Sequence, residues 1–426
     1  MPGMVITTNT NAESLSREII PLDMSGFPVC DREQTPAADV LLALSRYDEP
    51  LQELAEAAQR PLSRFPIKYA LDNRYDVALA HLASLKSCAQ VLQLRAIAEL
   101  EAGKNESALN DLKLMLRLAD SIQSEPFQGS HLVRASIIGM TIQPIWEGLA
   151  AQRWKKSELM ALNGILSRLD LLADWKSSLD AERAIDIATI EHERNHRTET
   201  SYWLLMASCP QLLMALDKWD FFIPRVPEVF GKFLGVILEP LPWEKLGHLL
   251  MNLPPDGWYE LNKVEISKFF QQQMSPIANP EKHILSREKY LKVSSLLDSK
   301  RYSGNFRPKD VFIYELSHGH LYGLQRLAAA QNGVDMAKVA CALELYHLAQ
   351  GNYPSALDAL PPQFTLVVPP DVVNGEPLHY RPTSGGRFLL YSAGWNGKDD
   401  GGIVGTNQFG RSDPKNGDWV WKYPSN

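Results

Sequence analysis

The sequence predicts a mainly α-helical chain that ends in a small α+β module. Between residue 37 and about residue 330, apolar residues recur mostly at three- and four-residue spacing, which is the period of an amphipathic helix. Short apolar runs with the character of strands follow residue 377, with glycine-rich connections between them. A length of 426 residues favours more than one domain. We expect an arm or linker at 1–36, a helical domain at 37–308 and the α+β module at 309–426.

The clearest helical pair runs from His81 to Ile122 and is interrupted at residues 103–105 by Gly-Lys-Asn. A second pair is expected from Ile142 to Leu172, with a turn near residues 152–157. The first turn resembles that of a tetratricopeptide-type repeat, in which small residues let two helices approach closely. No fixed period connects the two turns, so the pattern favours an irregular helical domain. A helical-repeat array is the alternative.

The C-terminal module is expected to begin with a helix that runs from Lys309 to Gln350 and stops at Gly351. A short helix should follow, begun by a serine and ended by two prolines. Two strands joined by a glycine-containing connection then predict a β-hairpin, and an aromatic run predicts a third strand. The expected segments are Ser355–Leu360 for the short helix and Leu378–Arg381, Arg387–Ser392 and Trp419–Tyr423 for the strands.

Composition excludes some classes of partner. The chain has 43 Lys and Arg against 50 Asp and Glu, a net charge of -7, so no strongly basic surface for nucleic acid is expected. No apolar window reaches the ~18 residues of a membrane span, and the first twenty residues lack the pattern of a secretory signal. Membrane anchoring is therefore not visible in this chain. The four cysteines contain no CxxC pair and are interpreted as small buried apolar residues.

An acidic, glycine-rich loop lies between the last two expected strands. Its oxygen-bearing side chains, together with carbonyl groups near Ala393, are of the kind that calcium takes as ligands on a backbone that can bend around the ion. The alternative is that these are solvated turn residues whose side chains bond to their own backbone. The candidate calcium ligands are Asn396, Asp399, Asp400, Asp413 and Asp418.

Four ordered segments of the C-terminal region resemble the soluble part of the major pseudopilins of type II secretion systems. They are ALELYHLAQGNYPSALDAL at 342–360, NGEPLHYR at 374–381, RFLLYSAGWNGKDDGG at 387–402 and DWVW at 418–421. The resemblance implies a long helix packed on a small antiparallel sheet and a calcium-binding loop after the LYS-type strand. Asn396 stands where the family usually has aspartate, and the loop at 401–417 is long.

Pseudopilins begin with an apolar anchoring helix, whereas about 300 residues precede the corresponding helix here. The chain more closely resembles long bacterial proteins that carry a helical region before such a module. The resemblance implies a location in the cell envelope or periplasm. We expect a non-catalytic, secretion-associated interaction protein with protein partners, and calcium as its candidate ion.

A zinc metallopeptidase is the competing hypothesis. His192, Glu193 and His196 form an HExxH string in a helical setting, where two histidines four residues apart share a face and can chelate zinc while the glutamate activates water. No residue is singled out as a third ligand, and Glu199, Glu228 and Glu239 are the acidic candidates. The alternative is an exposed, charge-rich helix with pairs such as Glu193 with Arg197.

Two weaker candidates lie elsewhere. His318 and His320 flank Gly319 and can be metal ligands, but the segment is interpreted as polar surface. Glu182 and Arg183 are interpreted as a salt bridge that holds helices together. No Walker loop, GxGxxG or GxSxG string is present.

Overall fold

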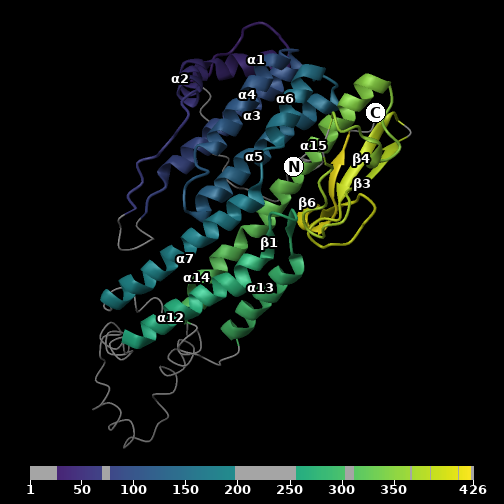
Figure 1. The fold of residues 1–426 in the computed structure, drawn as a ribbon. Coiled ribbons are helices and arrows are strands. Elements are labelled where there is room, and N and C mark those ends of the chain that lie inside the picture. Colours follow the sequence, from purple (N-terminus) through teal and green to yellow (C-terminus); the bar gives the residue numbers. More distant parts are fainter. Residues whose placement is uncertain are drawn as a thin grey trace, which may run out of the picture.

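The computed structural model describes residues 26–69, 77–196, 256–302, 311–364, 367–383, 385–410 and 412–423. This part of the chain is mostly helical, with small antiparallel sheets, and the larger of them lies near the C-terminal end (Figure 1). The longer helices are α1 (Pro36–Leu44), α2 (Asp48–Ala58), α3 (Ala80–Glu101), α4 (Asn105–Asp120), α5 (Gln128–Ala150), α6 (Lys156–Leu166), α7 (Leu171–Asn195), α12 (Asp256–Phe269), α13 (Arg287–Tyr302), α14 (Val311–Tyr322) and α15 (Leu324–Gln350).

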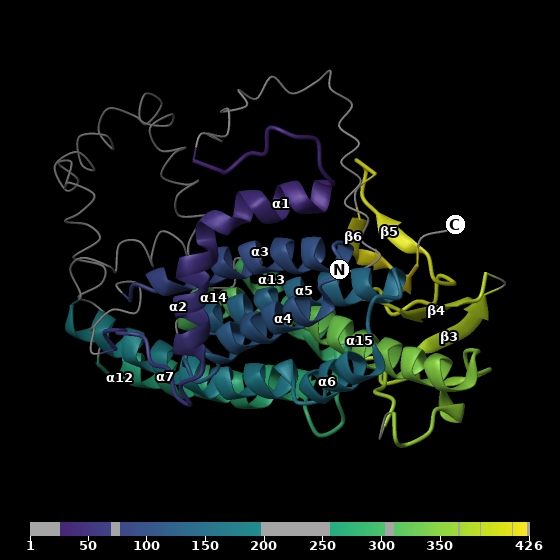
Figure 2. The same cartoon turned by 90° about the horizontal axis from the view of Figure 1, so that it is seen from above.

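The first predicted helical pair is present: helices α3 and α4 form a hairpin that packs against α5. Helix α6 follows α5 after the predicted turn, but its main packing partner is α15, so the second expected pair is not a packed hairpin. Trp154 lies in the connection between α5 and α6 and donates a hydrogen bond of 3.1 Å from its indole N–H to the carbonyl of Ile145. Helix α1 packs on α3, and helix α2 packs on α4 (Figure 2).

No helix in the described ranges is both long enough and apolar enough to cross a bilayer.

Helix α15 is the central element. It packs on α5, α6 and α7, and it also contacts the C-terminal strands β4 (Arg387–Ser392) and β7 (Trp419–Lys422). A single cluster of buried apolar residues extends from Leu51 in α2 to Tyr423 after β7. The core therefore includes residues on both sides of residue 308, and the expected division into domains stays a prediction.

The region expected as one helix from Lys309 to Gln350 contains two helices, α14 and α15, which meet at Gly323. Gly351 ends α15 as predicted, in the left-handed conformation with φ of 78° that glycine adopts without strain. The short helix expected at Ser355–Leu360 is only a 3-10 turn, Leu357–Ala359. A proline pair follows it, so there is no room for an α-helical turn.

The predicted three-stranded sheet is confirmed, with antiparallel order β3 (His379–Thr383), β4, β7. Two further hairpins were not predicted: β1 (Ala278–Asn279) with β2 (Ile284–Leu285), and β5 (Val404–Thr406) with β6 (Ser412–Gly417). β6 reads SDPKNG, a turn-like composition that gives no alternating apolar signal.

The expected arm is described from residue 26 onward, where Phe27 packs edge-on against Tyr47. Of the cysteines, Cys341 is buried as expected, whereas Cys30 and Cys88 are half-buried. The burial prediction for these two is therefore wrong, and Cys209 lies outside the described residues.

Candidate functional site

Helix α7 carries an unusual set of polar residues on its buried side. Asp170 caps the helix by accepting hydrogen bonds from the backbone N–H groups of Leu172 and Ala173. The buried polar residues that follow are spaced three or four apart, so they share one face. They are Asp174, Ser178, Glu182, Asp186, Thr189 and Glu193. Helices α5, α12 and α15 pack against α7.

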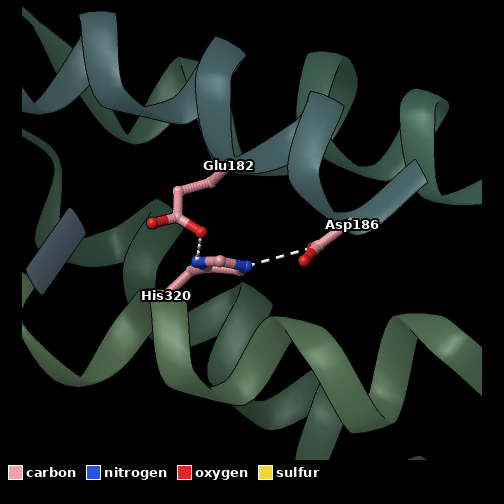
Figure 3. A group of neighbouring side chains, drawn as sticks. All are labelled: Glu182, Asp186 and His320. Atoms are coloured by element: carbon pink, nitrogen blue, oxygen red, sulfur yellow. Dashed lines mark hydrogen bonds and ion pairs between the residues drawn. The ribbon is translucent and has the colours of Figure 1, made fainter. Parts of the chain in front are cut away.

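Two carboxylates of this face meet one histidine from α14. Glu182, Asp186 and His320 are 6%, 0% and 2% exposed. Figure 3 shows the His320 ring between the two carboxylates, with Nε2 3.1 Å from Asp186 Oδ2 and Nδ1 3.9 Å from Glu182 Oε2. Within the described residues, this is the one group of three or more His, Cys, Asp or Glu side chains whose ligand atoms all lie within 4.8 Å of one another.

Gln128, the first residue of α5, forms hydrogen bonds with both Glu182 and His320. Its backbone N–H donates to Glu182 Oε1 at 2.6 Å. Its side-chain N–H donates to the His320 carbonyl at 2.8 Å, while its Oε1 lies 3.1 Å from His320 Nδ1. The carboxylate of Glu182 at the N-terminus of α5 complements the dipole of that helix. The cluster therefore fixes α5 and α14 to the middle of α7.

This arrangement corrects two predictions. His320 is buried and not part of a polar surface, while the side chain of His318 lies outside the described residues. Glu182 bonds to Gln128 and faces His320, and Arg183 instead forms an ion pair of 3.3 Å with Asp180 on the same helix. The salt bridge expected between Glu182 and Arg183 is therefore not formed.

The HExxH residues lie at the C-terminal end of α7. The rings of His192 and His196 stack with their centroids 4.2 Å apart, and Glu193 is buried. His196 follows the last helical residue, and its Nδ1 lies 3.1 Å from the His192 carbonyl. Glu193 is therefore not exposed, whereas the ion pairs of Arg194 with Glu191 and Glu260 agree with the charge-rich alternative.

A zinc site at this string stays a prediction. Glu199, Glu228 and Glu239, the candidates for a third ligand, lie outside the described residues, as does Arg197. The charged neighbour inside the string, Arg194, forms ion pairs with Glu191 and with Glu260.

The candidate calcium ligands mostly bond to the backbone of their own loop. Asp418 is buried and accepts from the N–H groups of Asp400 at 3.2 Å and Gly402 at 2.6 Å. Burial raises the pKa of Asp418, although these N–H groups act in the opposite direction. The side-chain amide of Asn396 donates to Asp400 Oδ2 at 3.0 Å. Asn396, Asp400 and Asp418 are therefore linked to one another by hydrogen bonds.

The other two candidates lie in separate hydrogen-bonded turns. Asp399 accepts from Gly401 N–H at 2.9 Å, a bond that lowers the pKa of its carboxyl group. Asp413 accepts from the Lys415 N–H at 3.0 Å and from the Asn416 amide at 2.7 Å. These bonds are those expected of turn residues, and calcium binding in the loop stays a prediction.

Comparisons of the chain with protein-family models, with curated proteins and with solved structures gave no match.

Proposed function

We propose that the chain is a non-catalytic interaction protein associated with the cell envelope or with secretion. The observation that carries this proposal is the β5–β6 hairpin, which exposes two large apolar side chains while its base is fixed by the acidic loop. Ile403 and Phe409 are 67% and 75% exposed. Exposed aromatic and aliphatic side chains on a fixed support are effective anchors for a protein partner.

The base of the hairpin is closed by direct bonds between its two ends. The N–H of Asp418 donates to the Ile403 carbonyl at 2.8 Å, and Gly402 N–H donates to the Asp418 carboxylate. β5 and β6 pair antiparallel between these ends, with Val404 opposite Gly417. The position of Phe409 beyond the strands is therefore constrained by the residues proposed to bind calcium.

We propose that one calcium ion binds at this base, with Asn396, Asp400 and Asp418 as its nearest ligands and Asp399 and Asp413 as further candidates. The resemblance to major pseudopilins supports this assignment. In the same proposal, α15 is the long helix that supports the sheet, and the helical hairpins form an irregular array that offers a second contact surface. Calcium then strengthens the hairpin and so the contact that it makes.

Site-specific photo-crosslinking in the native host tests the interaction. A photoreactive residue at Phe409 is expected to give a discrete protein adduct, whereas one at Leu62, an exposed apolar position in the connection between α2 and α3, is expected to give none. An adduct pattern that is the same at both positions, or no adduct at either, would contradict the proposal.

The zinc metallopeptidase is the second candidate, favoured by the adjacent rings of His192 and His196 and by the buried Glu193. Metal analysis of the purified protein, followed by peptide hydrolysis assays of the wild type and of Glu193→Gln, separates the two functions. Hydrolysis that depends on Glu193 would replace the interaction proposal with the enzyme.

A further inference from the structure

We propose that Glu182, Asp186 and His320 bind one divalent transition-metal cation of the Zn²⁺ class between α7 and α14. This site is separate from the calcium loop and from the HExxH string, and the inference goes beyond the proposed interaction function. It depends on the ligand chemistry of three buried side chains (Figure 3) and on the way that Gln128 orients His320.

The ligand set suits such an ion. One imidazole and two carboxylates are ligands for Zn²⁺, Mn²⁺ or Fe²⁺, whereas calcium takes an all-oxygen shell. Two ligand atoms at bond lengths of about 2.0–2.2 Å from one ion lie at most about 4.4 Å apart. The three ligand atoms here lie within 4.8 Å. Small side-chain rotations are therefore enough to bring them to one ion.

Gln128 determines which ring nitrogen is free to bind. Because its side-chain N–H donates to the His320 carbonyl, its Oε1 faces His320 Nδ1 and accepts the Nδ1–H. A metal-binding histidine usually donates its second ring N–H in this way. His320 Nε2 is left facing the Asp186 carboxylate at 3.1 Å. Two lone pairs at that distance repel, so either a proton or a metal ion belongs between them.

The Glu182 carboxylate has one oxygen that faces the His320 ring. Glu182 Oε1 is held by the Gln128 N–H, and Oε2 is the oxygen nearer the ring. Buried carboxylates are stabilised when they coordinate a metal.

Ser317 carries a buried hydroxyl group on the same helix as His320. Ser317 precedes His320 by one turn of α14 and so lies on the same side of the helix. Its Oγ is buried and has no hydrogen-bond partner in the structure. A buried hydroxyl group without a partner is costly, and a carboxylate ligand or a metal-bound water would accept its hydrogen bond.

The test uses the full chain, stripped with chelator and dialysed against Zn²⁺ alone, with bound metal measured by mass spectrometry. We expect one equivalent of zinc per chain, and at least a tenfold loss of affinity in His320→Gln and in Asp186→Asn. His192→Gln with His196→Gln is the matched control and is expected to retain the metal. Retention by His320→Gln, or loss in the control, would overturn the assignment.

A second measurement uses the wild type alone and therefore does not depend on whether the variants fold. Zn²⁺ added to the stripped wild type is expected to raise its melting temperature, and Co²⁺ in its place is expected to show visible absorption bands of a low-symmetry nitrogen and oxygen site. If neither signal appears in the wild type, the assignment is overturned and the three residues only link the helices by hydrogen bonds.

Discussion

His283 and Asp335 form a hydrogen-bonded pair in which Nε2 of the ring lies 2.6 Å from Oδ2 of the carboxylate. The pair joins the turn between β1 and β2 to the middle of α15, where Asp335 is fully buried. Asp335 also accepts a hydrogen bond of 3.2 Å from Gln331, whose Oε1 accepts from the first N–H of α7. The β1–β2 turn, α15 and α7 are therefore linked by one chain of polar contacts.

Stability at acidic pH is predicted to depend on this pair. Burial lowers the pKa of His283. The hydrogen bond to Asp335 and the negative charge of Asp335 together have the larger effect and raise the pKa above 6.5. A raised histidine pKa stabilises the fold below 6.5, and this contribution is lost as the pH rises through the folded pKa. We expect His283→Gln to cost about 1–2 kcal/mol at pH 6 and less at pH 9.

Urea unfolding at the two pH values measures this difference. His379→Gln, at a half-exposed ring 3.6 Å from Asp399, is the matched control and should change little at either pH. An equal loss for His283→Gln at pH 6 and pH 9 would show that the ring contributes packing alone.

Glu99 in α3 is predicted to destabilise the protein above neutral pH. Burial and the nearby charge of Asp111 raise the pKa of its carboxyl group to about 7, and its Oε2 has no hydrogen-bond partner. Because the folded pKa is raised, the contribution of Glu99 to stability falls as the pH rises from about 4.5 through about 7.

Replacement of Glu99 by glutamine should remove this dependence. We expect Glu99→Gln to raise the free energy of unfolding by about 1–2 kcal/mol at pH 8.5 and by less at pH 5. Denaturant unfolding of Glu99→Gln and of Glu101→Gln, an exposed position on the same helix, checks this. A gain for Glu99→Gln that does not vary with pH would be the contrary result.

The packing of Trp154 on α5 is predicted to depend on the absence of a side chain at Gly148. A Cβ at this position would lie 2.1 Å from Trp154 Nε1, whereas a Cβ at Gly139 on the same helix would meet nothing within 4 Å. We expect Gly148→Ala to cost about 1–3 kcal/mol through overpacking. Gly139→Ala should stabilise by about 0.5–1 kcal/mol. Thermal melts of both variants measure the contrast, and a neutral Gly148→Ala would contradict the packing.

Local periodicity was enough to predict much of the helical region and the β3–β4–β7 sheet, because those signals lie within one segment. The β5–β6 hairpin was missed, since its second strand is polar and is held by backbone bonds. The partners of His320 were missed for another reason: Asp186 is 134 residues away, and only the fold brings them together.

One signal for that cluster was nevertheless present in the sequence. Glu182 and Asp186 are four residues apart and share a face of α7 with the buried Leu179. Carboxylates inside an apolar stripe predict a buried partner. That partner was interpreted as Arg183, the adjacent residue, but consecutive residues of a helix point in different directions.

Calcium titration of the purified protein, followed by thermal melting, tests the central claim most directly. If the loop holds calcium, a calcium concentration one hundred times the Kd of the site should stabilise the wild type by about 2.7 kcal/mol. Asp400→Asn should lose most of this stabilisation, whereas the control Asp358→Asn should keep it. Melting temperatures that do not change with calcium in the wild type would contradict a calcium-stabilised hairpin.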